Sequence, residues 1–124
     1  MPSLILVMLG GALGSGARHL TGRAALALMG PDLPWGTLTV NLAGGLLMGI
    51  LVGVLTRTTA PEGWRLFLAV GVLGGFTTFS SFSLDVVTLA QRGQIGMAAG
   101  YALLSVAGSI AALVAGLTMT RSWA

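Results

Sequence analysis

Four long apolar segments, separated by short polar breaks, dominate the pattern of hydrophobic and polar positions along this chain. A helix rises about 1.5 Å per residue, so about 17 to 25 apolar residues are needed to cross the hydrocarbon core of a bilayer. Each apolar segment reaches that length. The pattern therefore predicts four membrane-spanning helices, over residues 4–29, 38–55, 66–89 and 97–119.

The third segment is interrupted over residues 74–83, where Gly74 and Gly75 are followed by three phenylalanines and five hydroxyl residues. Each glycine weakens a helix by about 1 kcal/mol relative to alanine. Hydroxyl side chains can satisfy the backbone groups that a break sets free, and irregular backbone within a bilayer is tolerated only where it is buried in protein or lines a watery cavity. We therefore predict a break in the third helix, with an ion or substrate site near the membrane midplane.

The polar breaks carry proline, glycine and charged residues, at 30–34, 57–65 and 91–94. Trp35, Trp64 and Trp123 each fall at a predicted membrane edge, where amphipathic aromatic rings are enriched. We expect one all-α membrane domain over residues 1–124.

Composition narrows the class of protein. Of 124 residues, 55% are hydrophobic and 7% charged, against about 25% charged in soluble domains, which indicates an integral membrane protein. The chain has no cysteine, which excludes disulfides and thiolate nucleophiles. The sequence pI of 11.3 comes from arginines scattered one or two to a loop, so nucleic acid is not an expected partner.

The arginines divide evenly between the two sides of the predicted membrane protein. The two groups of three are Arg57, Arg65 and Arg121 on the side of the termini, and Arg18, Arg23 and Arg92 on the other. Because a bias in Lys and Arg sets orientation, a chain without bias is expected to insert both ways. This dual topology favours an antiparallel homodimer. The alternative is that other features select one orientation.

Small residues recur at intervals of four on every predicted helix. The sets are Gly10/Gly14, Gly45/Gly49/Gly53, Gly71/Gly75 and Gly108/Ala112/Gly116. This spacing allows neighbouring helices to approach at backbone distance.

Few polar side chains lie within the apolar segments, so the candidates for chemistry are clear. Asn41, on the small-residue face of its helix, offers two N–H donors suited to an anion, or a hydrogen bond between helices. Tyr101, Ser105 and Ser109, four residues apart, form a hydroxyl stripe that could pass an anion from donor to donor or bond back to its own helix.

Phe79 and Phe82 share one face of the segment after the break. Aromatic edges are electropositive and can line an anion path, although such a pair also serves simple packing.

Charges inside the spans are functional hypotheses by default. Arg18 could raise the local anion concentration at the mouth of a cavity, or could form a structural ion pair with Asp85. His19 is the only histidine, which excludes a catalytic triad or histidine metal cluster, and we interpret it as interfacial.

Three groups of residues together resemble the bacterial Fluc (CrcB) family of fluoride-specific channels. They are Gly10-Gly with Gly14 and Ala17-Arg18, Gly36-Thr-Leu with Asn41-Leu, and Gly-Gly-Phe-Thr-Thr-Phe-Ser-Ser-Phe-Ser at 74–83. The resemblance covers essentially the whole chain. It implies a passive fluoride exporter, built as an antiparallel dual-topology homodimer that spans the bacterial plasma membrane, with two fluoride pores.

The resemblance also implies a central Na⁺ held by the backbone carbonyls of Gly74 and Thr77 from both subunits. A broken helix frees carbonyl dipoles, and hard oxygen ligands suit a hard cation. Fluoride-pore roles are implied for six residues: Asn41, Phe79, Phe82, Tyr101, Ser105 and Ser109. Arg18 and Asp85 would lie at the vestibule, and a glutamate is common in the family at the position of Asp85.

Two other classes of function are weighed against a channel. A small multidrug-type proton-coupled antiporter resembles this chain in architecture but needs a carboxylate in its first helix, and residues 4–29 contain none. A scaffold subunit without transport would leave the interruption at 74–83 unexplained. An enzyme is not expected, because three acids and one histidine are spread over separate segments.

Overall fold

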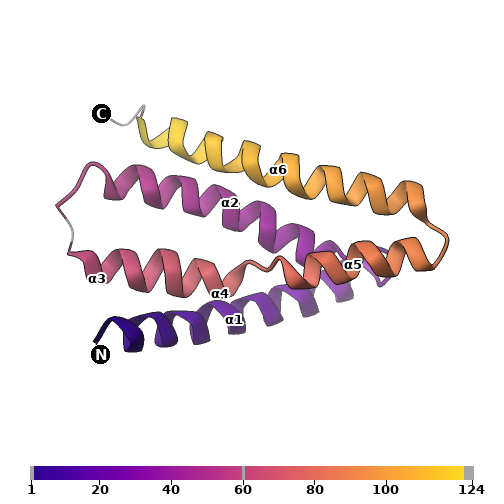
Figure 1. Ribbon diagram of the computed structural model, residues 1–124, viewed down its shortest axis with the longest axis horizontal. Helices are drawn as coiled ribbons and strands as arrows, with labels where there is room; N and C mark the ends of the chain where they lie inside the picture. The colour runs from indigo at the N-terminus through magenta and orange to yellow at the C-terminus, as the bar shows by residue number, and fades with distance from the viewer. Residues whose placement is uncertain (1, 60, 122–124) are drawn as a thin grey trace.

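The computed structural model describes residues 2–59 and 61–121, which form four long helical spans joined by short connections (Figure 1). Three spans are single α-helices: α1 (Pro2–Met29), α2 (Trp35–Leu55) and α6 (Ile95–Arg121). The third is built from α3 (Glu62–Arg65), the π-helix η1 (Leu66–Leu73), α4 (Gly74–Phe76) and α5 (Ser80–Gln91). All four are long and apolar enough to cross a membrane, which confirms the predicted spans.

The helices begin two to four residues earlier than the apolar pattern predicts. Hydropathy registers only the lipid-facing middle of a span, whereas the helical backbone continues through polar residues at the membrane surface. Both α2 and α3 start directly after a proline, Pro34 and Pro61, because proline lacks an N–H and is tolerated at a helix start. Trp35 and Trp64 lie in these first turns, as predicted, and Trp123 lies outside the described residues.

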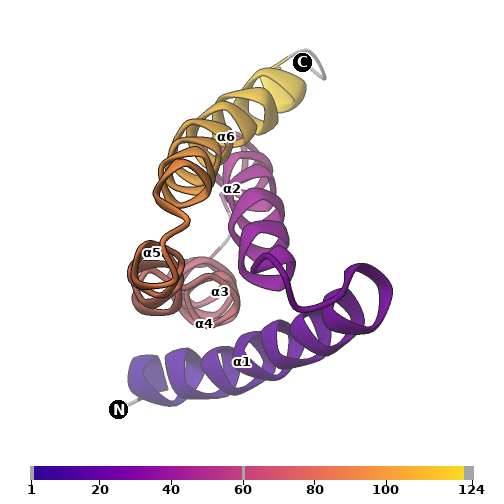
Figure 2. The same cartoon turned by 90° about the vertical axis from the view of Figure 1, so that its right-hand side faces the viewer.

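The spans form an open arc with α2 near its centre. The end view in Figure 2 places α6 on one side of α2 and α1 on the other, with the third span beside both α1 and α2. Helix α6 packs along α2 and also contacts α5. The start of α1 and the end of α6 lie at the same end of the molecule, as expected from an even number of spans (Figure 1).

Glycines bring the helices together at backbone distance. A Cβ atom added to Gly14 would overlap the carbonyl oxygen of Val72, and one added to Gly75 would lie 2.6 Å from that of Gly11, so α1 and the third span touch directly. On the other side, a Cβ on Gly45 would lie 2.6 Å from the carbonyl oxygen of Ser109 in α6. The predicted close packing through small residues is confirmed.

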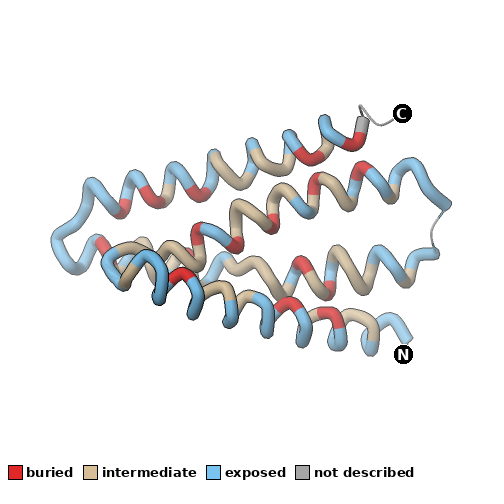
Figure 3. The backbone as a smooth tube through the Cα atoms, turned by 180° about the vertical axis from the view of Figure 1, so that it is seen from behind, coloured by how far each residue is buried: buried red, intermediate tan, exposed pale blue. Residues whose placement is uncertain are grey.

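Buried positions follow the lines where helices meet, and the outer faces of the spans are exposed (Figure 3). Those outer faces carry many large apolar side chains, such as Leu28 and Leu103. A soluble monomer rarely exposes such extensive apolar surface, whereas bilayer lipid solvates it. The protein is therefore a multi-pass membrane protein.

The contact of α1 with the third span should depend on the absence of a side chain at Gly14. In Gly14→Ala the new methyl group meets the rigid carbonyl of Val72, and we expect a loss of about 1–3 kcal/mol from overpacking. A Cβ on Gly16, in the same helix, meets nothing within 4 Å, so Gly16→Ala is the matched control. Thermal unfolding in detergent compares the two variants. Equal midpoints would contradict the packing described above.

Candidate functional site

The third span is interrupted between α4 and α5, at residues 77–79. Thr77 takes an extended conformation (φ −89°, ψ 160°), which ends α4. The backbone N–H and the hydroxyl of Thr77 both donate to the Leu73 carbonyl, each over 3.0 Å. This geometry confirms the predicted break.

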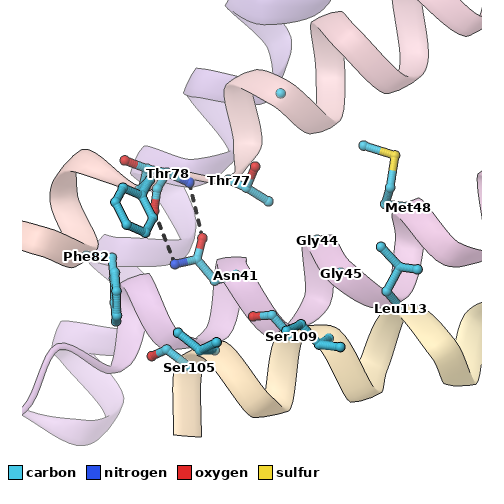
Figure 4. A pocket seen from close by; sticks show the side chains of 14 residues that line it. Asn41, Gly44, Gly45, Met48, Thr77, Thr78, Phe82, Ser105, Ser109 and Leu113 are labelled. Atoms are coloured by element: carbon cyan, nitrogen blue, oxygen red, sulfur yellow. Dashed lines mark hydrogen bonds between the residues drawn. The ribbon is translucent and has the colours of Figure 1, made fainter. Parts of the chain in front are cut away.

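Asn41 of α2 holds the break by pairing with the backbone of Thr78 (Figure 4). Its Nδ2 donates to the Thr78 carbonyl oxygen over 3.2 Å, and its Oδ1 accepts from the Thr78 N–H over 3.1 Å. The side-chain amide thus takes the place of a peptide group from a neighbouring turn. The hydrogen bond between helices that the sequence left as one alternative is therefore present. It uses only one of the two N–H groups of the amide.

Two hydrogen bonds at the break replace those of a continuous helix. The Thr78 N–H, which a helix would direct to the Gly74 carbonyl, instead reaches Asn41. The Ser81 N–H, which would reach the Thr77 carbonyl, donates to the Thr78 hydroxyl over 3.1 Å. These exchanges leave the carbonyls of Gly74 and Thr77 without their helical donors.

The carbonyl of Gly75, which follows Gly74 in the chain, receives a charged donor. Arg18 of α1 donates from Nε to the Gly75 oxygen over 3.2 Å. Asp85 accepts from the Tyr101 hydroxyl over 3.1 Å. Arg18 and Asp85 therefore have separate partners, and within the described chain they do not form an ion pair with each other.

A groove of about 550 Å³ opens beside the break. Figure 4 shows α2 as its floor, with the third span on one side and α6 on the other. The groove brings together seven of the predicted site residues: Asn41, Gly74, Thr77, Phe79, Phe82, Ser105 and Ser109. These residues come from three spans that are far apart in the sequence.

Ser105 is the most buried hydroxyl of this groove, at 4% exposure. Its Oγ finds no hydrogen-bond partner among the described residues. A buried polar group without a partner costs about 1–3 kcal/mol. Ser105 therefore places a buried hydroxyl, neighbour to the Tyr101 hydroxyl, at the wall of the groove.

Three aromatic rings form a row, and two of them, Phe79 and Phe82, line the groove. Phe82, only 8% exposed, lies between Phe79, with ring centroids 5.6 Å apart, and Tyr101, at 5.4 Å. Phe79 is 76% exposed on the open side of the groove. Tyr101 packs against Phe82 without lining the groove itself.

The sequence did not single out Thr78, and it gave Gly75 a role only in weakening the helix and in packing. Thr78 joins Asn41 to α5, and Gly75 joins Arg18 to the break. The run of hydroxyl residues indicated that side chains satisfy freed backbone groups here. It could not indicate that Thr78 caps α5 while its peptide pairs with another span.

A family model and several known proteins match this chain over nearly its whole length. The chain matches the family model described as "CrcB-like protein, Camphor Resistance (CrcB)" over residues 5–117. It is 51% identical over 122 residues to a protein of Mesorhizobium japonicum, covering 98% of each chain. It is 55% identical over 123 residues to a protein of a Chelativorans species, again covering 98% of each. Both relatives are named "Fluoride-specific ion channel FluC".

A third relative so named, from Sphingopyxis alaskensis, is 53% identical over 98% of this chain and 97% of its own length. These matches each cover 98% of the chain, so they include nearly the whole fold. The chain belongs to the CrcB-like protein family.

Proposed function

We propose that this protein is a fluoride-selective channel that lets fluoride leave the cell passively. The observation that carries the proposal is the groove at the helix break, where neutral donors and aromatic edges from three spans converge. The relatives named above as fluoride-specific channels support the same activity. The protein is accordingly an ion channel and not an enzyme, and we expect its fluoride flux to be uncoupled from protons.

Fluoride is a small, strongly hydrated anion, so a pore must replace its water with other donors. The second N–H of Asn41 and the hydroxyls of Ser105 and Ser109 supply hydrogen bonds along the groove. The edges of Phe79 and Phe82 supply weaker positive electrostatic potential, which holds an anion without trapping it. Larger halides are excluded by the narrow width of a pore that is walled on all sides.

A second, antiparallel copy of the chain covers the open side of the groove and completes the wall of the pore. One copy leaves the polar groups of Asn41, Thr77 and Ser105 beside an open groove, and such groups cannot face lipid without cost. The exposed ring of Phe79 borders the same opening. Because the arginines are balanced between the two sides, both orientations insert and can pair.

Sodium binds between the two copies, held by the backbone carbonyls of Gly74 and Thr77. Both carbonyls belong to residues that line the groove, and the helical N–H of each is diverted to another acceptor. Uncommitted carbonyl oxygens are the hard ligands that Na⁺ prefers. When bound, the ion supplies a positive charge that ties the two broken helices together.

Arg18 and Asp85 act at the mouth of the pore. The guanidinium of Arg18 lies against the break through Gly75, where its charge raises the local concentration of anions. Asp85 positions Tyr101, and Tyr101 in turn supports the ring of Phe82. In this arrangement Tyr101 serves the pore through Phe82.

The proposed activity is tested by ion efflux from liposomes that contain the purified protein. Fluoride and chloride electrodes record in parallel, and a potassium ionophore dissipates the voltage. We expect fast loss of fluoride without loss of chloride. Fluoride loss that requires an imposed proton gradient would indicate a coupled carrier, and an intact dimer that releases neither ion would indicate a scaffold.

Replacing the central ring of the aromatic row should impair transport and spare the fold. In Phe82→Ile the volume is largely kept but the electropositive edge is lost. We expect fluoride efflux to fall by about tenfold or more, the change that corresponds to about 1.4 kcal/mol. Phe67→Ile, in η1 against Trp64 and away from the groove, is the control. Normal fluoride efflux by Phe82→Ile would show that the Phe82 ring has no role in the pore.

Removal of sodium should weaken the dimer. Purified protein is passed over a sizing column in sodium chloride and, separately, in choline chloride at the same ionic strength. Without Na⁺ the carbonyls of Gly74 and Thr77 in the two copies repel one another, so we expect the dimer fraction and fluoride efflux to fall together. A dimer that is equally stable in both salts would argue against an ion between the copies.

A further inference from the structure

The connection at residues 30–34 and the turn at 92–94 lie at the end of the molecule away from the start of α1 (Figure 1). Between them is a pocket of about 350 Å³ that shares no lining residue with the groove. Its charged lining residues are Asp32 and Asp85, which are acidic, and Arg92, which is basic. We propose that this headgroup pocket binds the phosphoethanolamine headgroup of a zwitterionic phospholipid.

Two opposite charges of the headgroup pocket have no ionic partner in the protein. Asp32 and Arg92 are both exposed, and the only ion pair within residues 2–59 and 61–121 joins Glu62 to Arg65. Asp85, the third charge, accepts from the Tyr101 hydroxyl and is therefore already engaged. Asp32 and Arg92 thus remain free to engage the two ends of a ligand that carries both charges.

A phosphoethanolamine group matches these two charges. Its primary ammonium offers three N–H donors to the carboxylate of Asp32, and its phosphate fits the planar fork of the Arg92 guanidinium. The Thr88 hydroxyl lines the same pocket and adds a neutral donor. A simple anion would meet two carboxylates and a simple cation would meet a guanidinium, so a zwitterion fits better than either. The pocket has the volume of about twelve water molecules at about 30 Å³ each, which is enough for this group.

The headgroup pocket lies at the level where phospholipid headgroups are found. Trp35 lines it, and tryptophan is enriched at the boundary between hydrocarbon and headgroups. Asp32 lies three residues after the end of α1, and Arg92 directly follows the end of α5. Both charges therefore lie just beyond membrane spans, where a headgroup can reach them.

A smaller apolar pocket next to the headgroup pocket provides a place for an acyl chain. Its volume is about 200 Å³, and it shares Leu33, Pro34 and Trp35 with the headgroup pocket. Met97 and Leu104 of α6 also line it, and both are exposed on the apolar outer surface. The continuity of a charged pocket with an apolar one favours a lipid over a soluble zwitterion as the ligand.

Direct binding tests the inference without a measurement of transport, so its failure would leave the channel proposal untouched. Purified protein in an uncharged detergent is titrated with dioctanoyl phosphatidylethanolamine, and the thermal unfolding midpoint is followed. We expect the midpoint to rise, because a ligand that binds only the folded protein stabilises it. Dioctanoyl phosphatidylcholine, whose ammonium has no N–H, and dioctanoyl phosphatidylglycerol, which has no ammonium, should raise it less. Equal shifts with all three lipids would overturn the proposal.

Variants of the two free charges should lose different parts of this preference. Asp32→Asn should weaken the apparent affinity for phosphatidylethanolamine by about tenfold, as expected for a charge-assisted hydrogen bond, and should leave that for phosphatidylglycerol unchanged. Arg92→Gln should weaken the affinity for all three lipids by about tenfold, because each carries a phosphate. Both positions are exposed and lie outside the helices, so we expect the variants to fold.

The matched control is Arg23→Gln, which removes an exposed guanidinium on the same side of the membrane but outside both pockets. We expect the control to bind phosphatidylethanolamine as the unmodified protein does. Unmodified affinity in both Asp32→Asn and Arg92→Gln would place the lipid elsewhere and overturn the proposal.

A parallel titration with free phosphoethanolamine, at matched ionic strength, separates a lipid from a soluble source of the same group. We expect no shift of the midpoint at concentrations where the lipid saturates, because the free compound has no acyl chain for the apolar pocket. A shift of equal size would overturn the assignment to a lipid and identify a soluble phosphorylated amine as the ligand. The absence of any response to phosphatidylethanolamine would overturn the site itself.

Discussion

Two hydrogen bonds between the side chain of Asn41 and the peptide of Thr78 hold the third span in two pieces. Without them, an N–H and a carbonyl would lie unpaired at membrane depth, at a cost of several kcal/mol. With them, the helix can stop and restart, and the carbonyls of Gly74 and Thr77 lose their helical donors. The groove, its hydroxyls and its aromatic row all lie around this one contact.

That contact depends in turn on glycine. A Cβ on Gly44, one turn after Asn41, would overlap the methyl group of Thr77, so α2 and the break can meet only where α2 has no side chain. Gly45 gives the same freedom toward α6. The stripe of small residues therefore does more than pack helices. It sets α2 close enough to both neighbours for a short amide to bridge to one and for the hydroxyls of the other to share a groove.

The sequence predicted the spans and the break because both follow from local chemistry: apolar length in one case, and adjacent glycines with hydroxyl residues in the other. Its few intramembrane polar residues made Asn41, Ser105 and Ser109 visible as candidates. It could not predict the partners of Arg18 or Asp85. Arg18 bonds to a residue 57 positions away and Asp85 to one 16 positions away, and such bonds depend on how whole helices pack. The fluoride assignment came from resemblance, since no local pattern encodes pore width.

A side chain that imitates a peptide group has a narrow tolerance for change. At this position the amide must offer a donor and an acceptor side by side, at the reach of one methylene. Aspartate would set an oxygen, in place of the Nδ2 donor, against the Thr78 carbonyl. Leucine would offer neither hydrogen-bonding group, and glutamine would extend the reach beyond the spacing that Gly44 fixes. The length of a single asparagine side chain thus sets the distance between α2 and the break, and its position along α2 sets the level at which the third span is interrupted.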